Sequence, residues 1–325
     1  MLSRRPHRMS QMPEAATSRF VQLPLWSIVR AAASAVLLSS IALAPAAVRA
    51  ADPSAGQATT SRAAREDAIH SIPFDRLSGE MRSHVSNVVN NASLYRRLPT
   101  QTIDCDPELY QFIIRNPEVV VDIWQVMGIT SMTLARTAPG HYQAADGQGT
   151  VGTVEYAYRS ADTQVIYSQG SYDGSLSPAR VRGECVVVLK SSYQRGPNGR
   201  TRITSRMDAF LRLDNVGIEW VARTLQPLLG KTADHNFIET ASFVSSLSHT
   251  AETNPAGMTR LSRRLVHVDA QTRQKLAEIS VRVADRAEAA QIGMAAEAAA
   301  AHVTAATASP AAVRVYRADG EPQQR

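Results

Sequence analysis

Residues 215–247 read NVGIEWVARTLQPLLGKTADHNFIETASFVSSL, and the rest of the chain is organised around this stretch. Its apolar residues recur at helical spacing: Val216, Val221, Leu225, Leu228, Leu229, Phe237, Ile238, Ala241, Phe243, Val244 and Leu247. Charged residues such as Arg223, Lys231 and Asp234 occupy other positions, so the pattern predicts an amphipathic helix with one apolar face. An apolar face of that length needs a sheet or another helix to cover it.

Strands precede this helix. Runs with alternating apolar and polar residues occur at 130–137, 141–146, 150–160, 163–172, 179–193 and 200–213, divided by turn-forming residues. The alternation is clearest in the last run, where Ile203, Met207 and Leu211 share one face and Arg202 and Arg206 the other. We therefore expect each strand to have one wet and one dry face, as in an antiparallel sheet covered on one side.

Two short helices are expected before the strands. Residues 100–105 form a short strand, and the pairs Asp106-Pro107 and Asn116-Pro117 each place a capping residue before a proline. The second helix ends at Gly128.

The flanks are simpler. We expect a linker at 51–73, an N-terminal helix within 74–98, the main domain at 99–250, and a loosely helical or disordered tail at 251–325.

A strand, two short helices, six strands and one long helix follow the order of helix-grip domains. In this order the sequence resembles the START/Bet v1-like superfamily (SRPBCC), which includes polyketide cyclases. The resemblance is carried by DPELYQFI at 106–113, by 119–128 with Trp124, and by the helix from Asn215. It implies an α+β fold in which a curved, antiparallel, seven-stranded sheet wraps around the long C-terminal helix and leaves a cavity between them.

Strand alternation and the helix pattern then give candidate ligand-binding residues, which share an inward direction: Trp124, Met132, Leu134, Tyr156, Tyr158, Tyr167, Met207, Leu211, Leu225, Leu229 and Phe237. An apolar lining with a few phenol groups suits a hydrophobic ligand with one polar end. The alternative is that these side chains fill a solid core.

Catalytic signals are weak. His235 and Glu239 lie one helical turn apart, next to Asp234, and could act as acid and base or form a polar stripe on a solvated helix. The sequence contains no Gly-x-Ser-x-Gly elbow and no metal-ligand spacing. We therefore predict no cofactor and no metal.

The sequence favours a binding or carrier protein for a hydrophobic small molecule or lipid. A cyclase- or hydratase-type enzyme using the same pocket and a structural envelope protein are the alternatives.

The N-terminal segment has the parts of a signal peptide. Residues 1–50 hold six of the 35 basic residues and one acid, followed within the segment by the apolar run 31–44 and small residues ending at Ala50. We expect cleavage after Ala50 and a periplasmic or extracellular protein; an uncleaved anchor is the alternative. The remainder has 29 basic and 28 acidic residues, which gives no reason to expect a nucleic acid partner. Peripheral membrane contact and the oligomeric state stay open.

Cys105 and Cys185 are the two cysteines of the chain. Export favours a disulfide. The helix-grip order, however, implies that their two strands flank the last strand on opposite sides, about two strand spacings apart, too far for a disulfide. We expect two unbonded thiols.

Overall fold

The computed structural model describes residues 56–174, 180–196, 200–214 and 226–308, and for 226–229 and 296–308 it describes only the helical backbone. The predicted signal peptide and its cleavage site lie outside these residues. In the described part of the chain, no helix has the length and apolar character needed to cross a membrane.

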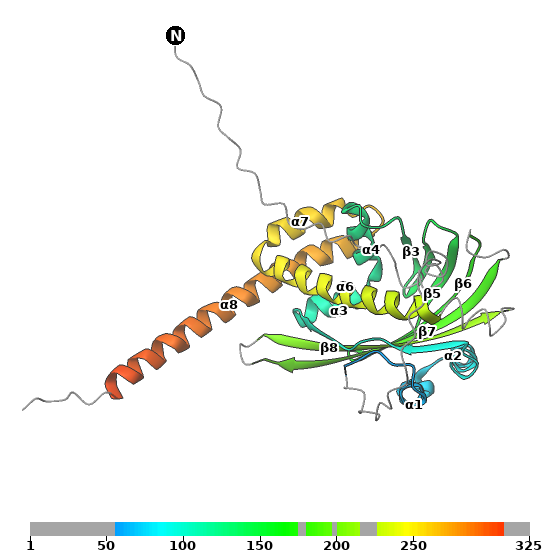
Figure 1. Cartoon of the computed structure of the whole chain (residues 1–325). Coiled ribbons are helices and arrows are strands. Elements are labelled where there is room, and N and C mark those ends of the chain that lie inside the picture. Colours follow the sequence, from blue (N-terminus) through cyan, green and yellow to red (C-terminus); the bar gives the residue numbers. More distant parts are fainter. Residues whose placement is uncertain (1–55, 175–179, 197–199, 215–225, 309–325) are drawn as a thin grey trace, which may run out of the picture.

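One curved antiparallel sheet of eight strands forms the centre of the fold (Figure 1). The strand order is β1-β8-β7-β6-β5-β4-β3, and β2 also pairs with β8. The strands are β1 Leu94–Arg97, β2 Gln101–Asp104, β3 Thr133–Ala138, β4 His141–Ala145, β5 Thr150–Arg159, β6 Thr163–Tyr172, β7 Val181–Arg195 and β8 Thr201–Asp214. With the long C-terminal helix, this arrangement confirms the predicted α+β helix-grip class. The sheet has eight strands instead of seven because β1 pairs with β8 beside β2.

The described helices are α1 Arg62–His70, the 3-10 helix η2 Phe74–Arg76, α2 Gly79–Asn90, α3 Pro107–Arg115, α4 Pro117–Val126, α6 Gln226–Thr253, α7 Pro255–Arg264 and α8 Ala270–Ala308. The predicted start of α3 is confirmed, since the Asp106 carboxylate accepts from the backbone N–H groups of Glu108 (2.9 Å) and Leu109 (3.2 Å). Pro107 occupies the first turn, where a missing N–H has no cost.

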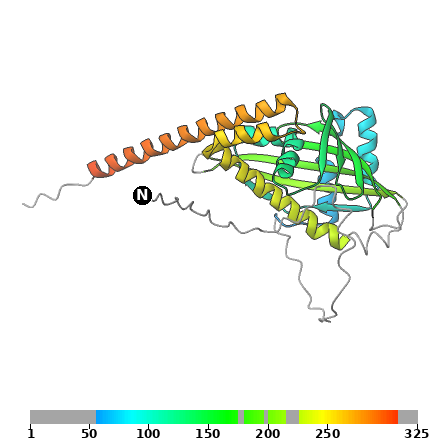
Figure 2. The same cartoon turned by 90° about the horizontal axis from the view of Figure 1, so that it is seen from above.

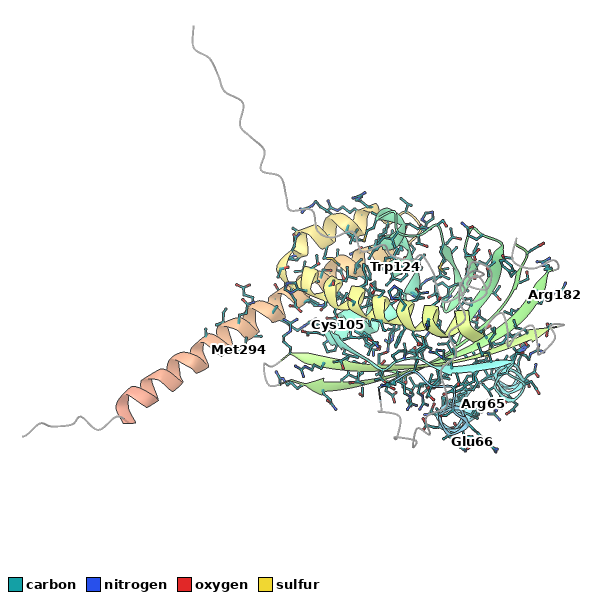
Figure 3. All side chains as sticks on the ribbon, viewed as in Figure 1. Arg65, Glu66, Cys105, Trp124, Arg182 and Met294 are labelled. Carbon is teal, nitrogen blue, oxygen red and sulfur yellow. The ribbon has the colours of Figure 1, made fainter. Side chains whose placement is uncertain are left out.

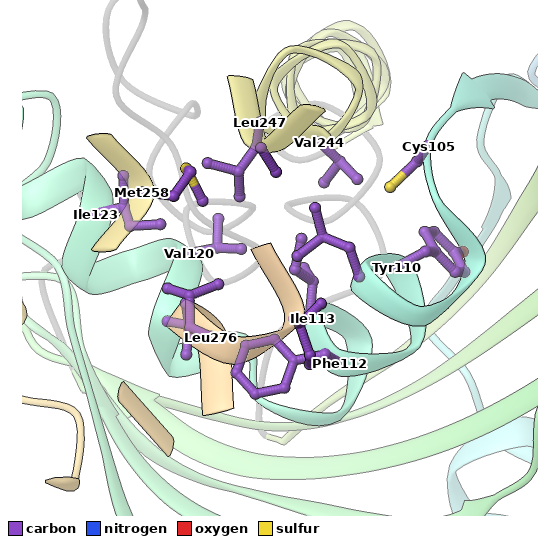
Figure 4. Close-up of a cluster of buried hydrophobic side chains, with 14 of the residues drawn as sticks. Cys105, Tyr110, Phe112, Ile113, Val120, Ile123, Val244, Leu247, Met258 and Leu276 are labelled. Carbon is purple, nitrogen blue, oxygen red and sulfur yellow. The ribbon is translucent and has the colours of Figure 1, made fainter. Parts of the chain in front are cut away.

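Helices α3, α4, α6, α7 and α8 enclose a cluster of buried apolar side chains at one end of the concave face, which we call the helical core (Figure 4). Its members include Leu109, Ile113, Val120, Ile123, Ile203, Ala241, Val244, Leu247, Met258, Leu276, Ile279 and Val283. Tyr110 adds a polar anchor to the sheet, because its hydroxyl lies 2.7 Å from Ser191 Oγ.

The convex face is also covered, so the expectation of one wet face per strand is wrong for much of the sheet. Helices α1 and α2 pack their buried residues, among them Ala68 and Val85, against Val165, Val186 and Phe210 of the strands. Residues 62–70, assigned above to a linker, are helix α1.

A buried carboxylate holds this N-terminal layer to the sheet. Asp208 of β8 is fully buried and accepts from Tyr95 Oη (2.6 Å) and Arg97 Nε (2.7 Å), both on β1. Arg97 also reaches Asp67 of α1 at 2.7 Å, so one network joins helix, edge strand and central strand.

The described residues of the tail expected at 251–325 are helical, and the first part of them packs on the body. Met258 of α7 and Leu276 of α8 are completely buried, and Ile279 and Val283 are nearly so. Beyond these contacts α8 continues as a long helix that projects from the body (Figures 1 and 2). Its docked half is therefore part of the folded unit.

Both cysteines are free thiols. The strand order on which that expectation rests is confirmed: β2, which ends beside Cys105, and β7, which carries Cys185, pair with opposite edges of β8.

Candidate ligand-binding cavity

Three glycines lie side by side across the concave face. Gly152 of β5 pairs with Gly170 of β6, which pairs with Gly183 of β7. Since glycine has no side chain, this row leaves a depression in the concave surface of the sheet, between the two neighbouring rows of side chains. One neighbouring row contains Val154, Ser168, Cys185 and Leu211, and the other Thr150, Tyr172 and Val181.

A cavity of about 150 Å³ lies over these rows. Its walls are almost entirely carbon, contributed by side chains such as Val154, Leu211 and Leu213 from the sheet and Ala233 from α6. Leu213 leans over Gly183, where a Cβ atom would lie only 2.8 Å from Leu213 Cδ2. The glycine therefore lets Leu213 form a wall instead of being pushed away.

An ion pair ties the sheet edge to the helix beside this cavity. Arg96 of β1 lines the cavity and donates through Nε to Asp234 of α6 at 2.8 Å. The Arg96 side chain crosses Gly230, where a Cβ would lie 3.3 Å from Arg96 Nη1. The two charges satisfy each other, so Arg96 does not present an unpaired charge to the interior.

Two further polar groups of the lining, on Tyr156 and Cys185, are engaged or neutral. Tyr156 Oη donates to the carbonyl of Ile114 at 2.7 Å, and burial raises the pKa of this phenol strongly. Burial also raises the pKa of the Cys185 thiol to about 12, so the thiol stays protonated at neutral pH.

Glu184 also borders the cavity, but its carboxylate is held by Tyr167 Oη and Arg212. Burial opposes ionisation of Glu184, yet these hydrogen bonds outweigh it and lower the pKa. The carboxylate is thus ionised and already paired.

Four of the predicted ligand-binding residues line the cavity: Met132, Leu134, Tyr156 and Leu211. Their role in binding stays a prediction. Leu225 lies outside the described residues, and the side chain of Leu229 is not described.

Three others share the concave side but not the cavity. Met207 and Phe237 pack together with Leu98 and Ala233 in an apolar cluster that adjoins the cavity, since Leu98 and Ala233 also line it. Trp124 belongs to the edge of the helical core, where its ring meets Phe243 edge-on at 5.6 Å between centroids. In Figure 3 it lies beside the helices, away from Arg182 at the far end of the sheet.

The predicted inward direction of Tyr158 and Tyr167 is wrong. Both pack with the convex cluster under α1 and α2. A β-bulge explains Tyr158: Tyr156 pairs with Ile166 but Tyr158 with Val165, so one extra residue reverses the alternation. Tyr167 lies in a strand that is largely buried on both faces, where alternation carries little information.

The glycine row was missed by sequence reasoning, whereas the strand alternation does place Ala209 on the inner face, where it lines the cavity. A glycine inside a strand signals a bulge or a close approach. The sequence shows each glycine but not the register that aligns them.

The acid–base candidates lie outside the cavity lining. His235 Nδ1 is 3.9 Å from Glu239 Oε1, and the histidine side chain is 48% exposed. Asp234 is occupied by Arg96. Among the described residues, no cluster of three or more histidine, cysteine, aspartate or glutamate side chains could hold a metal ion.

No protein-family model matches the chain, and no curated protein matches its sequence. Similar solved structures include an uncharacterized protein from Rhizobium leguminosarum, with 12% identity and a TM-score of 0.27, covering 45% of this chain and 95% of that one. The di-domain aromatase/cyclase BexL from the BE-7585A biosynthetic pathway has 17% identity and a TM-score of 0.26, covering 51% of this chain. Apo dicamba monooxygenase has 11% identity and a TM-score of 0.26, covering 65% of this chain.

The chain spans 50% of the cyclase and 63% of the monooxygenase. The chain's own sheet order and long helix place it in the helix-grip class of folds, which the START/SRPBCC-like ligand-binding domains share.

Proposed function

We propose that this protein binds a small, uncharged, apolar molecule in the cavity between the sheet and α6, without chemical conversion. The observation that carries the proposal is the paired glycines Gly170 and Gly183 in the cavity lining, which leave space in an otherwise well-filled interior. A carbon-lined space of this kind favours apolar ligands because water inside it would find few hydrogen-bonding partners.

The cavity volume bears on ligand size. An apolar cavity of roughly 150 Å³ accepts a molecule like benzene, whereas pockets for larger ligands enclose about 300–1,000 Å³. The volume of about 150 Å³ here therefore supports a ligand with one aromatic ring or a short branched chain over a sterol or a diacyl lipid.

The state of the lining groups supports binding over catalysis. A cyclase or hydratase needs an acid and a base that both reach the substrate. Among the described lining residues, Arg96 and Glu184 are paired, and burial keeps the Cys185 thiol protonated. The Tyr156 hydroxyl already donates to a backbone carbonyl.

A thermal-shift and calorimetric titration tests this proposal. Toluene and indole should raise the melting temperature and bind with one site per chain, while cholesterol and palmitate should not. Stabilisation by a ligand follows its concentration relative to Kd, so the shift should grow with toluene concentration. Ala209→Phe, which projects a ring into the cavity, should abolish the shift.

Ala289→Phe provides the matched control, because Ala289 is exposed on α8. This variant should bind toluene like the unsubstituted chain. Stabilisation by cholesterol or palmitate would favour lipid carriage. Binding of none of the four probes, with both variants folded, would overturn the proposal in favour of a structural role.

We further propose that the protein is exported and cleaved after Ala50. The apolar run at 31–44 and the small residues before Ala51 support this. N-terminal sequencing of the chain from the envelope or medium should begin at Ala51. Recovery of an intact Met1 there would contradict the cleavage.

A further inference from the structure

The outer face of α7 carries three arginines. Arg260, Arg263 and Arg264 are exposed, while Met258 and Ser262 on the opposite side of the helix are buried. The spacing of three and four residues places the three guanidinium groups on one face. This face points away from the helical core.

The charge excess continues into the following turn and the start of α8. Residues 255–275 contain five basic residues and a single acid, Asp269, whereas residues 51–325 as a whole hold 29 basic and 28 acidic residues. Within the same segment, Val266 is 75% exposed. The surface is thus basic and carries one exposed apolar side chain, Val266.

Nearby acids are already used inside the fold. Asp122 accepts from the backbone N–H of His267 at 2.9 Å and faces its Nδ1 at 3.1 Å. Asp269 accepts from the N–H (2.9 Å) and hydroxyl (2.6 Å) of Thr272. Glu252 is paired with Arg200 at 2.9 Å.

The three arginines of α7 are not neutralised by these acids. Within the residues described by the structure, none of the three arginines lies in an ion pair. The positive charge of this face is available to an external partner.

We propose that the outer face of α7, with Val266, docks on an anionic phospholipid membrane. Clustered arginines are attracted to acidic headgroups, and an exposed aliphatic side chain beside them gains by entering the interface. A nucleic acid would satisfy the arginines but would leave Val266 against phosphate or water. This surface lies at the end of α6 away from Ala233, so the proposal does not depend on the cavity.

Sedimentation of the full chain with vesicles tests the proposal. Vesicles of phosphatidylcholine mixed with phosphatidylglycerol should bind the protein, and vesicles of phosphatidylcholine alone should not. Arg263→Glu/Arg264→Glu should weaken binding at least about tenfold, since each basic group near an anionic surface contributes measurably. Added salt should weaken the binding of the unsubstituted chain.

The control variant, Arg76→Glu/Arg202→Glu, makes the same change of charge on the convex side. Both arginines are exposed, and neither is in an ion pair among the described residues. Because all variants keep the same N-terminal segment, its own affinity for membranes cancels in the comparison. Circular dichroism checks that each variant is folded.

The expected result is loss of binding in the α7 variant and retention in the control. Equal loss in both would show a mere effect of net charge and overturn the proposal. So would equal binding to both kinds of vesicle, or binding to duplex DNA without binding to vesicles.

Discussion

The two ends of the concave face are built on strands with the same alternation of side chains, but one end is filled and the other contains a cavity. At one end, large side chains such as Leu109, Ile203 and Leu276 fill the space under the helices. At the other, Gly170 and Gly183 line a space that is left unfilled. The comparison teaches that one curved sheet supports both a core and a cavity, depending on the size of its own side chains and on the helices that cover each end.

Truncating a buried side chain of the filled end should have the largest effect on stability. Leu276 is completely buried between α8 and the helices around it, so Leu276→Ala should cost about 2–5 kcal/mol of unfolding free energy, because it leaves a void. Urea denaturation measures this cost. Ile292→Ala, at a 64% exposed position of the same helix, should stay within about 0.5 kcal/mol. Equal, small effects would mean that α8 is not part of the cooperative core.

The same substitution at both ends compares them directly. Ala241 lies in the helical core and Ala209 in the cavity wall. Ala241→Phe should cost about 1–3 kcal/mol by overpacking, whereas Ala209→Phe should cost under about 1 kcal/mol, because its ring enters existing space. Thermal and urea unfolding of both variants give the difference. A larger cost for Ala209→Phe would show that the glycine row does not leave usable space.

Sequence reasoning found the filled end more easily than the empty one. The pairs Asp106-Pro107 and Asn116-Pro117 and the apolar spacing of 241–247 are local patterns, and the helices they predict are present, although the Asn116 side chain makes no capping hydrogen bond. Strand β1, with the sequence LYRR, has no alternation to detect and exists because it pairs with β8 more than a hundred residues away.

Long-range contacts explain the other misses. The stripe of Leu276, Ile279 and Val283 is visible in the sequence as a weak apolar face, but its partners on α3 and α6 are not. The cavity depends on the register of three strands, and the bulge between Tyr156 and Tyr158 changes which side chains face it. Local periodicity does not encode either feature.

The two thiols offer a probe that leaves the packing intact. Burial raises the pKa of both Cys105 and Cys185 to about 12, so both thiols stay protonated at neutral pH and neither is activated. Cys105 lies in the helical core and Cys185 in the cavity wall. Methyl methanethiosulfonate should therefore modify Cys185 faster in the native protein, and toluene should slow that reaction.

Single-cysteine variants, Cys105→Ser and Cys185→Ser, assign the two rates by mass spectrometry. Equal rates in the native protein would indicate that both thiols react only through unfolding. A faster Cys105 would contradict the contrast between the two ends.

The smallest effect on stability is expected for the ion pairs that join α3 to α8 at the filled end. Glu108 of α3 accepts from Arg282 Nη2 at 2.6 Å and Arg286 Nη2 at 2.9 Å, both on α8, and all three side chains are partly exposed. Hydrogen bonding from Arg282 is the main cause of the lowered pKa of Glu108, against a smaller opposing effect of burial. Exposed ion pairs contribute little, so Glu108→Gln should cost at most about 1 kcal/mol at pH 7.

The pH dependence follows from that lowered pKa. The carboxylate contributes its stabilisation fully above the ordinary glutamate pKa of 4.5 and loses it as the pH falls through the lower folded-state pKa. The difference in unfolding free energy between the unsubstituted chain and Glu108→Gln should therefore shrink below that pH, and also in high salt. Glu288→Gln, which removes a carboxylate at an exposed position of α8, is the control. If Glu108→Gln instead costs as much as Leu276→Ala, ion pairs rather than apolar packing dock α8, and the filled end is not held by side-chain volume.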